Sequence, residues 1–185
     1  MATTNTRITT GEVRLSFAHL FEPYANPGSG DEPKYSVTLV IPKSDAATVE
    51  KIRKAQQAAL EKGKDSKFGG KIPKTWNDTL RDGDESDRPE YEGCWYISTR
   101  AGVNYPPMVV DRSRNEIIDP REIYSGVYAR AAIDAFAFNS NGNKGVSFQI
   151  VAVQKTKDGE PFAGGAPVKA DDLFDDLGGT EEELI

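Results

Sequence analysis

The chain has 185 residues, a size typical of one domain with a tail, and a formal net charge of -6 at pH 7. Its single Cys, Cys94, and single His, His19, cannot supply the ligand set of a structural zinc site, and Cys94 has no partner for an internal disulfide. No apolar run approaches the about 20 residues needed to cross a bilayer, and the first residues do not resemble a secretion leader. We therefore expect a soluble, unexported protein in a reducing compartment, with no metal, no cofactor and no membrane contact.

The acidic residues gather at the end of the chain. Residues 171–185 hold seven of the 29 acidic residues, four Asp and three Glu, and contain no Lys or Arg. The remaining 22 acidic residues stand against 23 basic ones, so the body carries a formal charge of +1. Residues 43–74 alone carry nine basic and four acidic residues. A near-neutral body with basic segments and a separate acidic end favours an anionic ligand that the tail mimics.

The first half of the body is predicted to begin with two strands. Apolar and polar residues alternate over residues 12–21, which is the period of a half-buried strand. The Pro- and Gly-rich residues 26–33 predict a loop, and alternation resumes over residues 35–41 until Pro42 ends the second strand. The expected inner residues of the first strand are Val13, Leu15 and Phe17.

One long helix is predicted after the second strand. Ser44 is the candidate N-cap, and the helix runs to about Lys62 through a segment rich in Ala, Gln, Lys and Glu. Residues 63–87 then form a long polar stretch, which is typical of a functional or mobile loop. The apolar stripe of the helix consists of Val49, Ile52, Ala59 and Leu60.

The second half of the body is predicted to be strands again. Residues 93–101 alternate, residues 108–111 and 117–118 are short strand candidates, and residues 123–139 form a long one. Asn141-Gly142 is the strongest hairpin-turn signal in the chain, so residues 123–155 are expected to form a hairpin. The inner residues of its first strand are Val127, Ala129, Ala131, Ile133, Ala135 and Ala137.

These elements indicate a mainly β fold of the α+β kind, a small Greek-key barrel or sandwich with one long helix. Residues 1–158 form the expected folded domain. Residues 159–170 are rich in Gly, Pro and Ala, which predicts a flexible linker, and residues 171–185 are the disordered acidic tail.

Catalysis finds no support in the motifs. The sequence lacks the nucleophile elbow, the phosphate-binding loop and the dinucleotide-binding glycine pattern, and His19 is interpreted as an ordinary strand residue. The acidic segment 82–87 resembles a calcium loop only superficially, because Asp87 stands where the loop needs Gly and Gly93 where it needs Glu. We expect neither an enzyme nor a calcium site.

Aromatic residues next to cations are the most informative pattern. Proteins that bind single strands without sequence preference stack bases on aromatic rings and hold phosphates in a basic groove. The alternative for each ring is a place in the core. Arg100 and Arg130 favour the binding interpretation, since both are expected on the less apolar face of their strands. The candidate nucleic-acid-binding residues are Lys71, Lys74, Trp76, Tyr96, Arg100, Tyr105, Arg112, Arg114, Tyr128, Arg130, Phe136 and Phe138.

The tail has two interpretations. Acidic segments of low hydrophobicity are commonly disordered solubilising ends. A pure solubiliser does not need apolar residues, however, and this tail has several that would share one side of a helical turn on a partner. We favour a docking segment made of Asp171, Asp172, Leu173, Phe174, Asp175, Asp176, Leu177, Leu184 and Ile185.

Several short motifs in a fixed order carry a family resemblance over nearly the whole chain. They are Arg81-Asp-Gly-Asp84, Pro89-Glu-Tyr-Glu-Gly93, Ser125-Gly-Val-Tyr-Ala-Arg130, Phe136-Ala-Phe138, Asn141-Gly-Asn-Lys-Gly145 and Asp158-Gly-Glu-Pro-Phe162. With the acidic end, they resemble a family of tailed-phage single-stranded-DNA-binding proteins. The resemblance implies an OB-fold barrel that coats single strands during replication or recombination. It also implies that the tail contacts replication proteins such as a polymerase or helicase and weakens DNA binding.

One departure is that the long helix precedes the third strand, whereas OB folds commonly place a helix after it.

The resemblance places the protein in the cytoplasm of an infected bacterial host. The alternative function is a non-enzymatic phage interaction or assembly protein that uses a β-sheet surface and a tail docking motif. Self-association of the chain into a homo-oligomer stays open in both interpretations.

Overall fold

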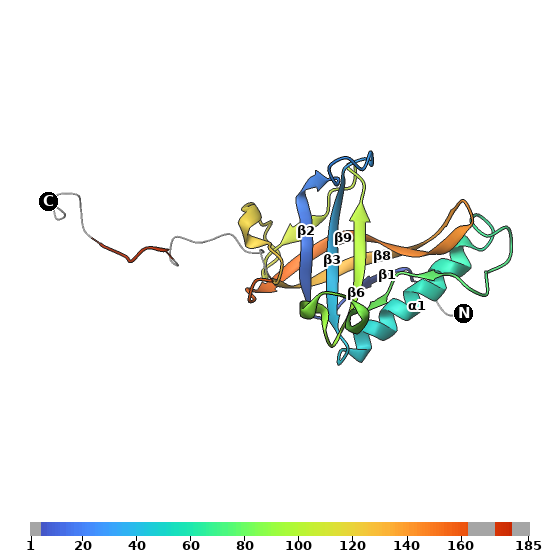
Figure 1. The fold of residues 1–185 in the computed structure, drawn as a ribbon, viewed down its shortest axis with the longest axis horizontal. Coiled ribbons are helices and arrows are strands. Elements are labelled where there is room, and N and C mark those ends of the chain that lie inside the picture. The colour runs from blue at the N-terminus through green and yellow to red at the C-terminus, as the bar shows by residue number, and fades with distance from the viewer. Residues whose placement is uncertain (1–4, 163–172, 179–185) are drawn as a thin grey trace.

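The computed structural model describes residues 5–162 and 173–178 (Figure 1). Its long helix, α1, spans Ala46–Gly63, and three short 3-10 helices cover Gly83–Glu85 (η1), Pro89–Tyr91 (η2) and Pro120–Glu122 (η3). The strands are β1 Arg7–Thr9, β2 Val13–Tyr24, β3 Lys34–Pro42, β4 Asn77–Asp78, β5 Arg81–Asp82, β6 Cys94–Ala101, β7 Met108–Val110, β8 Tyr128–Ser140 and β9 Asn143–Lys157.

Five of the strands close on themselves as a barrel. They follow one another in the order β8-β2-β3-β6-β9, and β9 pairs back with β8. All contacts in this ring are antiparallel except the one between β6 and β9, which is parallel. The short strands β1, β4, β5 and β7 add to the outside of the ring. This is the Greek-key topology of an OB-fold barrel, so the predicted fold class is confirmed.

Alternation along the strands explains the core. All six residues expected on the inner side of the long strand, five in β8 and Val127 just before it, are at most 8% exposed, and Leu15, Leu39 and Ile97 from three other strands are fully buried. The turn prediction is also confirmed, because Asn141 and Gly142 both have positive φ angles, 50° and 89°, between β8 and β9.

The expectation for Phe17 is wrong. Its side chain is 48% exposed, whereas Ser16 and Leu20 are buried. The register between β2 and β3 shifts between Ser16 and His19, and Phe17 has a φ of 50°. This bulge inserts residues that the partner strand does not match, so the alternation changes phase in the middle of β2.

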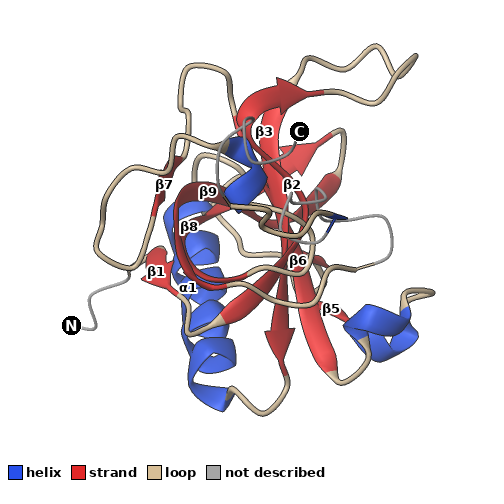
Figure 2. Ribbon diagram, turned by 90° about the vertical axis from the view of Figure 1, so that its left-hand side faces the viewer, coloured by secondary structure: helices blue, strands red, loops and turns tan. Residues whose placement is uncertain are grey.

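Helix α1 begins one residue later than expected. Asp45, not Ser44, is the N-cap, and its Oδ1 accepts a hydrogen bond from the Thr48 amide at 3.2 Å. The helix lies along the barrel beside β8 and β1 (Figure 2) and connects β3 to β6, as the order of predicted elements requires. Its stripe is confirmed for Ile52, Ala59 and Leu60, whereas Val49 is half-buried.

Two other expected strand segments differ in the structure. Residues 117–118 lie outside the strands of the described chain, although the neighbouring Glu116 forms an isolated bridge with Val110. Residues 123–127 turn instead of extending, because the Val127 amide donates to the Tyr124 carbonyl at 3.1 Å. Buried Ile123 and Tyr124 account for the apolar pattern that predicted a strand there.

Residues 159–162 belong to the predicted linker and contact the body, whereas residues 163–170 of that linker lie outside the described residues. The Arg14 guanidinium lies 4.9 Å from the Tyr128 ring centre and 4.4 Å from that of Phe162, and it donates to the carbonyls of Gly126 and Glu160. Phe162 is only 8% exposed. We call residues 159–162 the strap.

The tail is described only over residues 173–178. Leu173, Phe174 and Leu177 are 63%, 73% and 76% exposed. Asp175 and Asp176 are exposed too. The other candidate tail residues, Asp171, Asp172, Leu184 and Ile185, lie outside the described residues. No helix in the described part of the chain is long and apolar enough to span a membrane.

Candidate nucleic-acid interface

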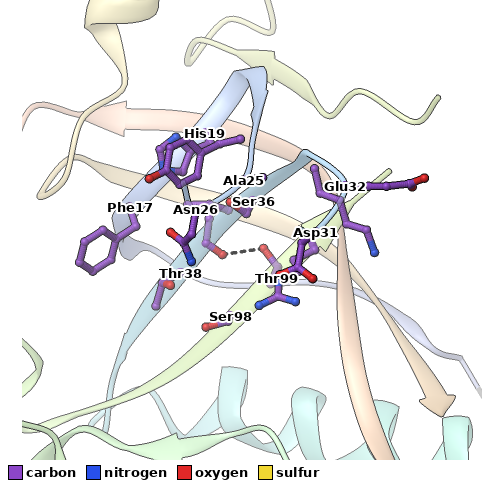
Figure 3. A pocket seen from close by; sticks show the side chains of 14 residues that line it. Phe17, His19, Ala25, Asn26, Asp31, Glu32, Ser36, Thr38, Ser98 and Thr99 are labelled. Atoms are coloured by element: carbon purple, nitrogen blue, oxygen red, sulfur yellow. Dashed lines mark hydrogen bonds between the residues drawn. The ribbon is translucent and has the colours of Figure 1, made fainter. Parts of the chain in front are cut away.

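A groove of about 650 Å³ runs over the outer faces of β2, β3 and β6 (Figure 3). Three small polar side chains, Ser36, Thr38 and Ser98, form much of its floor, and Arg100, which pairs with Ser36 across β3 and β6, adds a long cationic side chain. The Thr99 hydroxyl donates to the Val37 carbonyl at 2.8 Å and ties the two strands together (Figure 3). Short side chains leave the floor open, so a ligand can approach the sheet closely.

Phe17 forms one wall of the groove. The β2 bulge turns its ring outward, and the Phe17 amide donates to the Ser125 hydroxyl at 3.0 Å. The Arg88 guanidinium lies 4.3 Å from the ring centre and also pairs with Glu90 at 3.7 Å. A half-exposed ring beside a cation can stack a flat ligand and attract an anion at the same point.

His19 and Tyr24 form a second aromatic element in the groove. Their rings are stacked, with centroids 4.2 Å apart and planes tilted by 6°. Partial burial lowers the pKa of the His19 imidazole, so the ring is neutral at pH 7. The pair therefore offers an uncharged stacking surface.

The groove contains two cations that form no ion pair with any carboxylate of the described residues. Within the described residues, neither Lys34 nor Arg100 forms an ion pair, and both line the groove. The loop between β2 and β3 places Asp31 and Glu32 on the rim. An anion is therefore attracted to the Lys34 and Arg100 side chains and repelled from the two carboxylates.

The structure brings Arg100 into this groove, but it distributes the other predicted residues differently. Tyr96 is on the same face of β6, yet it is half-buried beside Tyr91, with ring centres 5.0 Å apart. Tyr91 is itself buried, and its hydroxyl donates to the Ser16 hydroxyl at 2.9 Å. Tyr105 is 67% exposed in the loop that follows β6.

Two predicted residues near the strap make contacts within the protein. Tyr128 is half-buried between the Arg14 and Lys157 cations, whose distances to its ring centre are 4.9 and 4.6 Å. Arg130 donates through Nε to the Thr10 carbonyl at 3.2 Å. These contacts give both residues a structural role.

The remaining predicted residues lie on two further surfaces. Arg112 and Arg114 belong to the loop after β7, where Arg112 donates to the Thr156 carbonyl at 2.9 Å. A set near the tip of the β8–β9 hairpin and after α1 comprises the exposed Lys71, Lys74 and Phe136 and the half-buried Trp76 and Phe138. The twelve predicted residues therefore do not form one site.

Five groove residues were missed by the sequence reasoning. The alternation rule assigned Phe17 to the core, and nothing local marks the bulge. Tyr24 and Lys34 could have been found, because they flank the Gly- and Pro-rich loop that connects the first two strands of the barrel, a loop that binds ligands in OB folds. The missed residues are Phe17, His19, Tyr24 and Lys34, which line the groove, and Arg88, which contacts the Phe17 ring.

A closed five-stranded barrel with an open groove across its second and third strands defines an OB-fold binding protein, a class that takes oligonucleotides or oligosaccharides at this place. Residues 6–185 match the family model described as Enterobacter phage Enc34, ssDNA-binding protein, and the chain belongs to this family. It is also 36% identical over 190 residues to protein p50 of Acyrthosiphon pisum secondary endosymbiont phage 1, covering 97% of this chain and 98% of that protein.

Solved structures agree with the family assignment. The single-stranded DNA-binding protein from bacteriophage Enc34 in complex with ssDNA superposes with a TM-score of 0.70 at 31% identity, covering 88% of this chain and 96% of that one. The single-stranded DNA-binding protein gp2.5 of bacteriophage T7 gives a TM-score of 0.61 at 15% identity, covering 94% of this chain and 97% of that one. The second likeness shows a shared fold.

Proposed function

We propose that this protein binds single-stranded DNA without sequence preference, in the groove over β2, β3 and β6. The observation that carries the proposal is that one open groove is lined by the exposed rings of Phe17 and Tyr24 and by two cations, Lys34 and Arg100, that form no ion pair within the described residues. The Enc34 structure described in complex with ssDNA supports it, because that chain shares the fold and the family. The function is binding, with no catalytic step.

The groove assigns separate tasks to separate side chains. Bases stack on Phe17 and on the His19–Tyr24 pair, since every base has an aromatic face and stacking tolerates any sequence. Phosphates are held by Lys34 and Arg100 and are kept from the rim by the carboxylates of the loop. The hydroxyls of the floor donate to whichever polar edge faces them.

The tail supplies the regulatory and partner-binding part of the proposal. Its exposed Leu173, Phe174 and Leu177 offer apolar contacts to a replication protein such as a polymerase or helicase in the infected bacterial cytoplasm. The seven carboxylates of residues 171–185 compete with phosphates for the cations of the body. These roles serve the replication or recombination of phage DNA.

Titration of a fluorescent oligothymidylate at two salt concentrations tests the binding function. The affinity of the intact protein is expected to fall steeply with salt, because each neutralised phosphate of a single strand releases counterions and adds about 0.7 to the logarithmic slope. The variant Lys34→Ala/Arg100→Ala should lose affinity and lower the slope by about 1.4.

The matched control removes two cations outside the groove. Lys54 pairs with Glu50 on the exposed side of α1, and Arg121 pairs with Asp119 in η3. The variant Lys54→Ala/Arg121→Ala has the same net charge as the groove variant and should bind nearly as well as the intact protein. Equal losses of DNA affinity in both variants would mean that net charge, and not the groove, determines binding. An affinity that does not depend on salt would exclude phosphate recognition. The absence of any DNA binding would favour the alternative of a protein-interaction module.

A further inference from the structure

A second basic surface lies after helix α1. Residues 62–74 contain five Lys and one Asp. All five Lys side chains are exposed, and none forms an ion pair within the described residues. Elsewhere the protein neutralises many of its cations, for example Lys43 with Asp82 and Lys155 with Glu122, each at 2.7 Å. Five unneutralised lysines in one short segment repel one another, so an anionic ligand would relieve a cost that the fold itself does not relieve.

This segment is fixed to the tip of the β8–β9 hairpin. Asn139 Nδ2 donates to the Lys67 carbonyl at 3.0 Å, and Asn77 pairs with Gly145 where β4 joins β9. Gly63 packs so closely on β8 that a Cβ there would lie 2.5 Å from the Ala137 methyl. Figure 1 shows the connection after α1 beside this hairpin tip. We call residues 62–74 and 136–146 together the lysine lobe, which also contains Lys144.

A cavity of about 310 Å³ opens where the lobe meets α1. Its apolar surface comes from small residues of α1 and β8 and from the ring of Phe136, which is 45% exposed. Lys62 and Lys67 also line it. Asp134 is the one carboxylate among the lining residues, and it already binds Arg7 at 2.9 Å. An exposed ring beside unneutralised cations repeats the chemistry of the groove.

The groove and the cavity lie in one row across the barrel. Arg100 of β6 pairs with Gln149 of β9, and Gln149 pairs with Asp134 of β8. Paired residues of neighbouring strands point to the same face, so all three lie on the outer surface. Two strand spacings amount to about 10 Å, a distance that one or two extended nucleotides can cross. Gln149 lines the cavity and therefore stands between the two sites.

We propose that a single strand leaving the groove at Arg100 crosses β9 at Gln149 and continues onto the lysine lobe. One base stacks on Phe136, and the phosphates that follow bind Lys62, Lys67 and the neighbouring lysines. The inference rests on the proposed function of the groove. It makes the binding site longer than the groove and gives the strand a curved path around the barrel.

Oligonucleotide length separates the two parts of the path. We compare fluorescent oligothymidylates of about 6 and about 20 nucleotides, because an OB fold alone occupies roughly 4 to 16 nucleotides. The variant is Lys62→Gln/Lys67→Gln/Lys71→Gln, with Phe136→Ala as a second, uncharged change. For the triple variant, the longer strand should bind about tenfold more weakly with a salt slope reduced by about 2, whereas the shorter strand keeps its affinity. Phe136→Ala should weaken only the longer strand, by about fivefold or more.

The control variant Lys51→Gln/Lys54→Gln/Arg121→Gln removes three cations outside the lobe and should leave the ratio of the two affinities unchanged. An unchanged ratio of the two affinities in the lobe variant overturns the inference. This covers the case in which neither strand loses affinity and the case in which both lose it equally, which would reflect net charge alone. A lobe that binds a peptide of residues 171–185 but does not affect the longer strand would be a tail-docking site, which also overturns it. Failure of the groove itself is distinguishable, because Lys34→Ala/Arg100→Ala would then leave both lengths unaffected.

Discussion

Phe17 holds its ring at the groove in a backbone conformation that residues with a Cβ rarely adopt. Its φ of 50° costs about 1 kcal/mol or more relative to an extended residue. The bulge, the hydrogen bond to Ser125 and the contact with Arg88 hold the residue there. Strain of this kind persists only where the surrounding structure offsets it, and strained residues are concentrated at functional sites.

Replacing Phe17 by Gly should separate stability from function. Glycine adopts the positive φ without strain, and the lost ring is half-exposed, so the free energy of unfolding should change by no more than about 1 kcal/mol. Binding of oligothymidylate should weaken by about 1 to 3 kcal/mol, since a stacking surface is lost. Thermal melts and titrations of the same preparation measure both. Strong destabilisation with unchanged DNA affinity would instead assign Phe17 to the fold.

His19 should make the stability depend on pH in a specific window. Burial lowers its pKa in the folded protein from 6.5, so the unfolded chain takes up a proton more readily. The stabilisation that comes from the neutral imidazole is fully present above the pKa of His19 in the unfolded chain. It is lost as the pH falls from that value through the lower pKa of the folded protein. Between pH 7.5 and 5.5 the melting temperature of the intact protein should therefore fall more than that of His19→Gln. Parallel falls in the two proteins would show that the imidazole does not contribute.

At the scale of elements, the strap is held by a close approach of backbones. Gly126 has a φ of 110°, and a Cβ there would lie 3.0 Å from the Phe162 amide nitrogen and closer still to the Glu160 carbonyl. Tyr124 also fixes the start of the strap, because its hydroxyl donates to the Gly159 carbonyl at 3.0 Å. This turn therefore fixes the strap on the body.

A pair of glycine substitutions tests the strap. Gly126 and Gly142 both have positive φ, but Gly142 has open space around its Cβ position. Gly142→Ala should cost only the backbone strain, about 1 to 2 kcal/mol, whereas Gly126→Ala should cost about 1 to 3 kcal/mol more through the clash. Chemical denaturation measures both values. Equal costs would mean that the strap moves away freely and that the close approach at Gly126 does not hold it.

At the scale of the whole molecule, the acidic tail faces a body whose formal charge is only +1. A short tether gives an attached segment an effective concentration in the millimolar range, so we expect even weak contacts between the tail and the cations of the body to be populated. The proposed groove and the lysine lobe both present such cations.

Deleting residues 171–185 should tighten the binding of single strands. The gain in affinity should be largest at 0.01 M salt, where the Debye length is about 30 Å. It should be smaller at 0.15 M salt, where the Debye length is only about 8 Å. Titrations of the intact and truncated proteins at both salt concentrations provide the measurement. The same deletion should remove binding to a replication partner in a pull-down. If both proteins bind DNA equally at low salt, the tail does not compete with DNA, and only its docking role is left to test.

The sequence by itself determined the elements whose signals are local. Alternation identified β3, β6 and the inner face of β8, because a half-buried strand must alternate wherever one face meets the core. The turn at Asn141-Gly142 was also predictable, since few residue pairs tolerate positive φ at both positions. Charge counting located the acidic tail, because the positions of charged residues can be read from the sequence alone.

Only the tertiary structure decided which side chains share a surface. The bulge at Phe17 depends on how β2 registers with β3, and register is a property of two strands that no single segment encodes. Barrel closure placed Arg100 in the groove with the β2 aromatics, whereas Tyr128 lies beside Arg14 and Arg130 donates to the Thr10 carbonyl outside that groove. The aromatic and cationic residue types were therefore predictable from the sequence, whereas their grouping into a groove and a lysine lobe required the long-range pairing of strands.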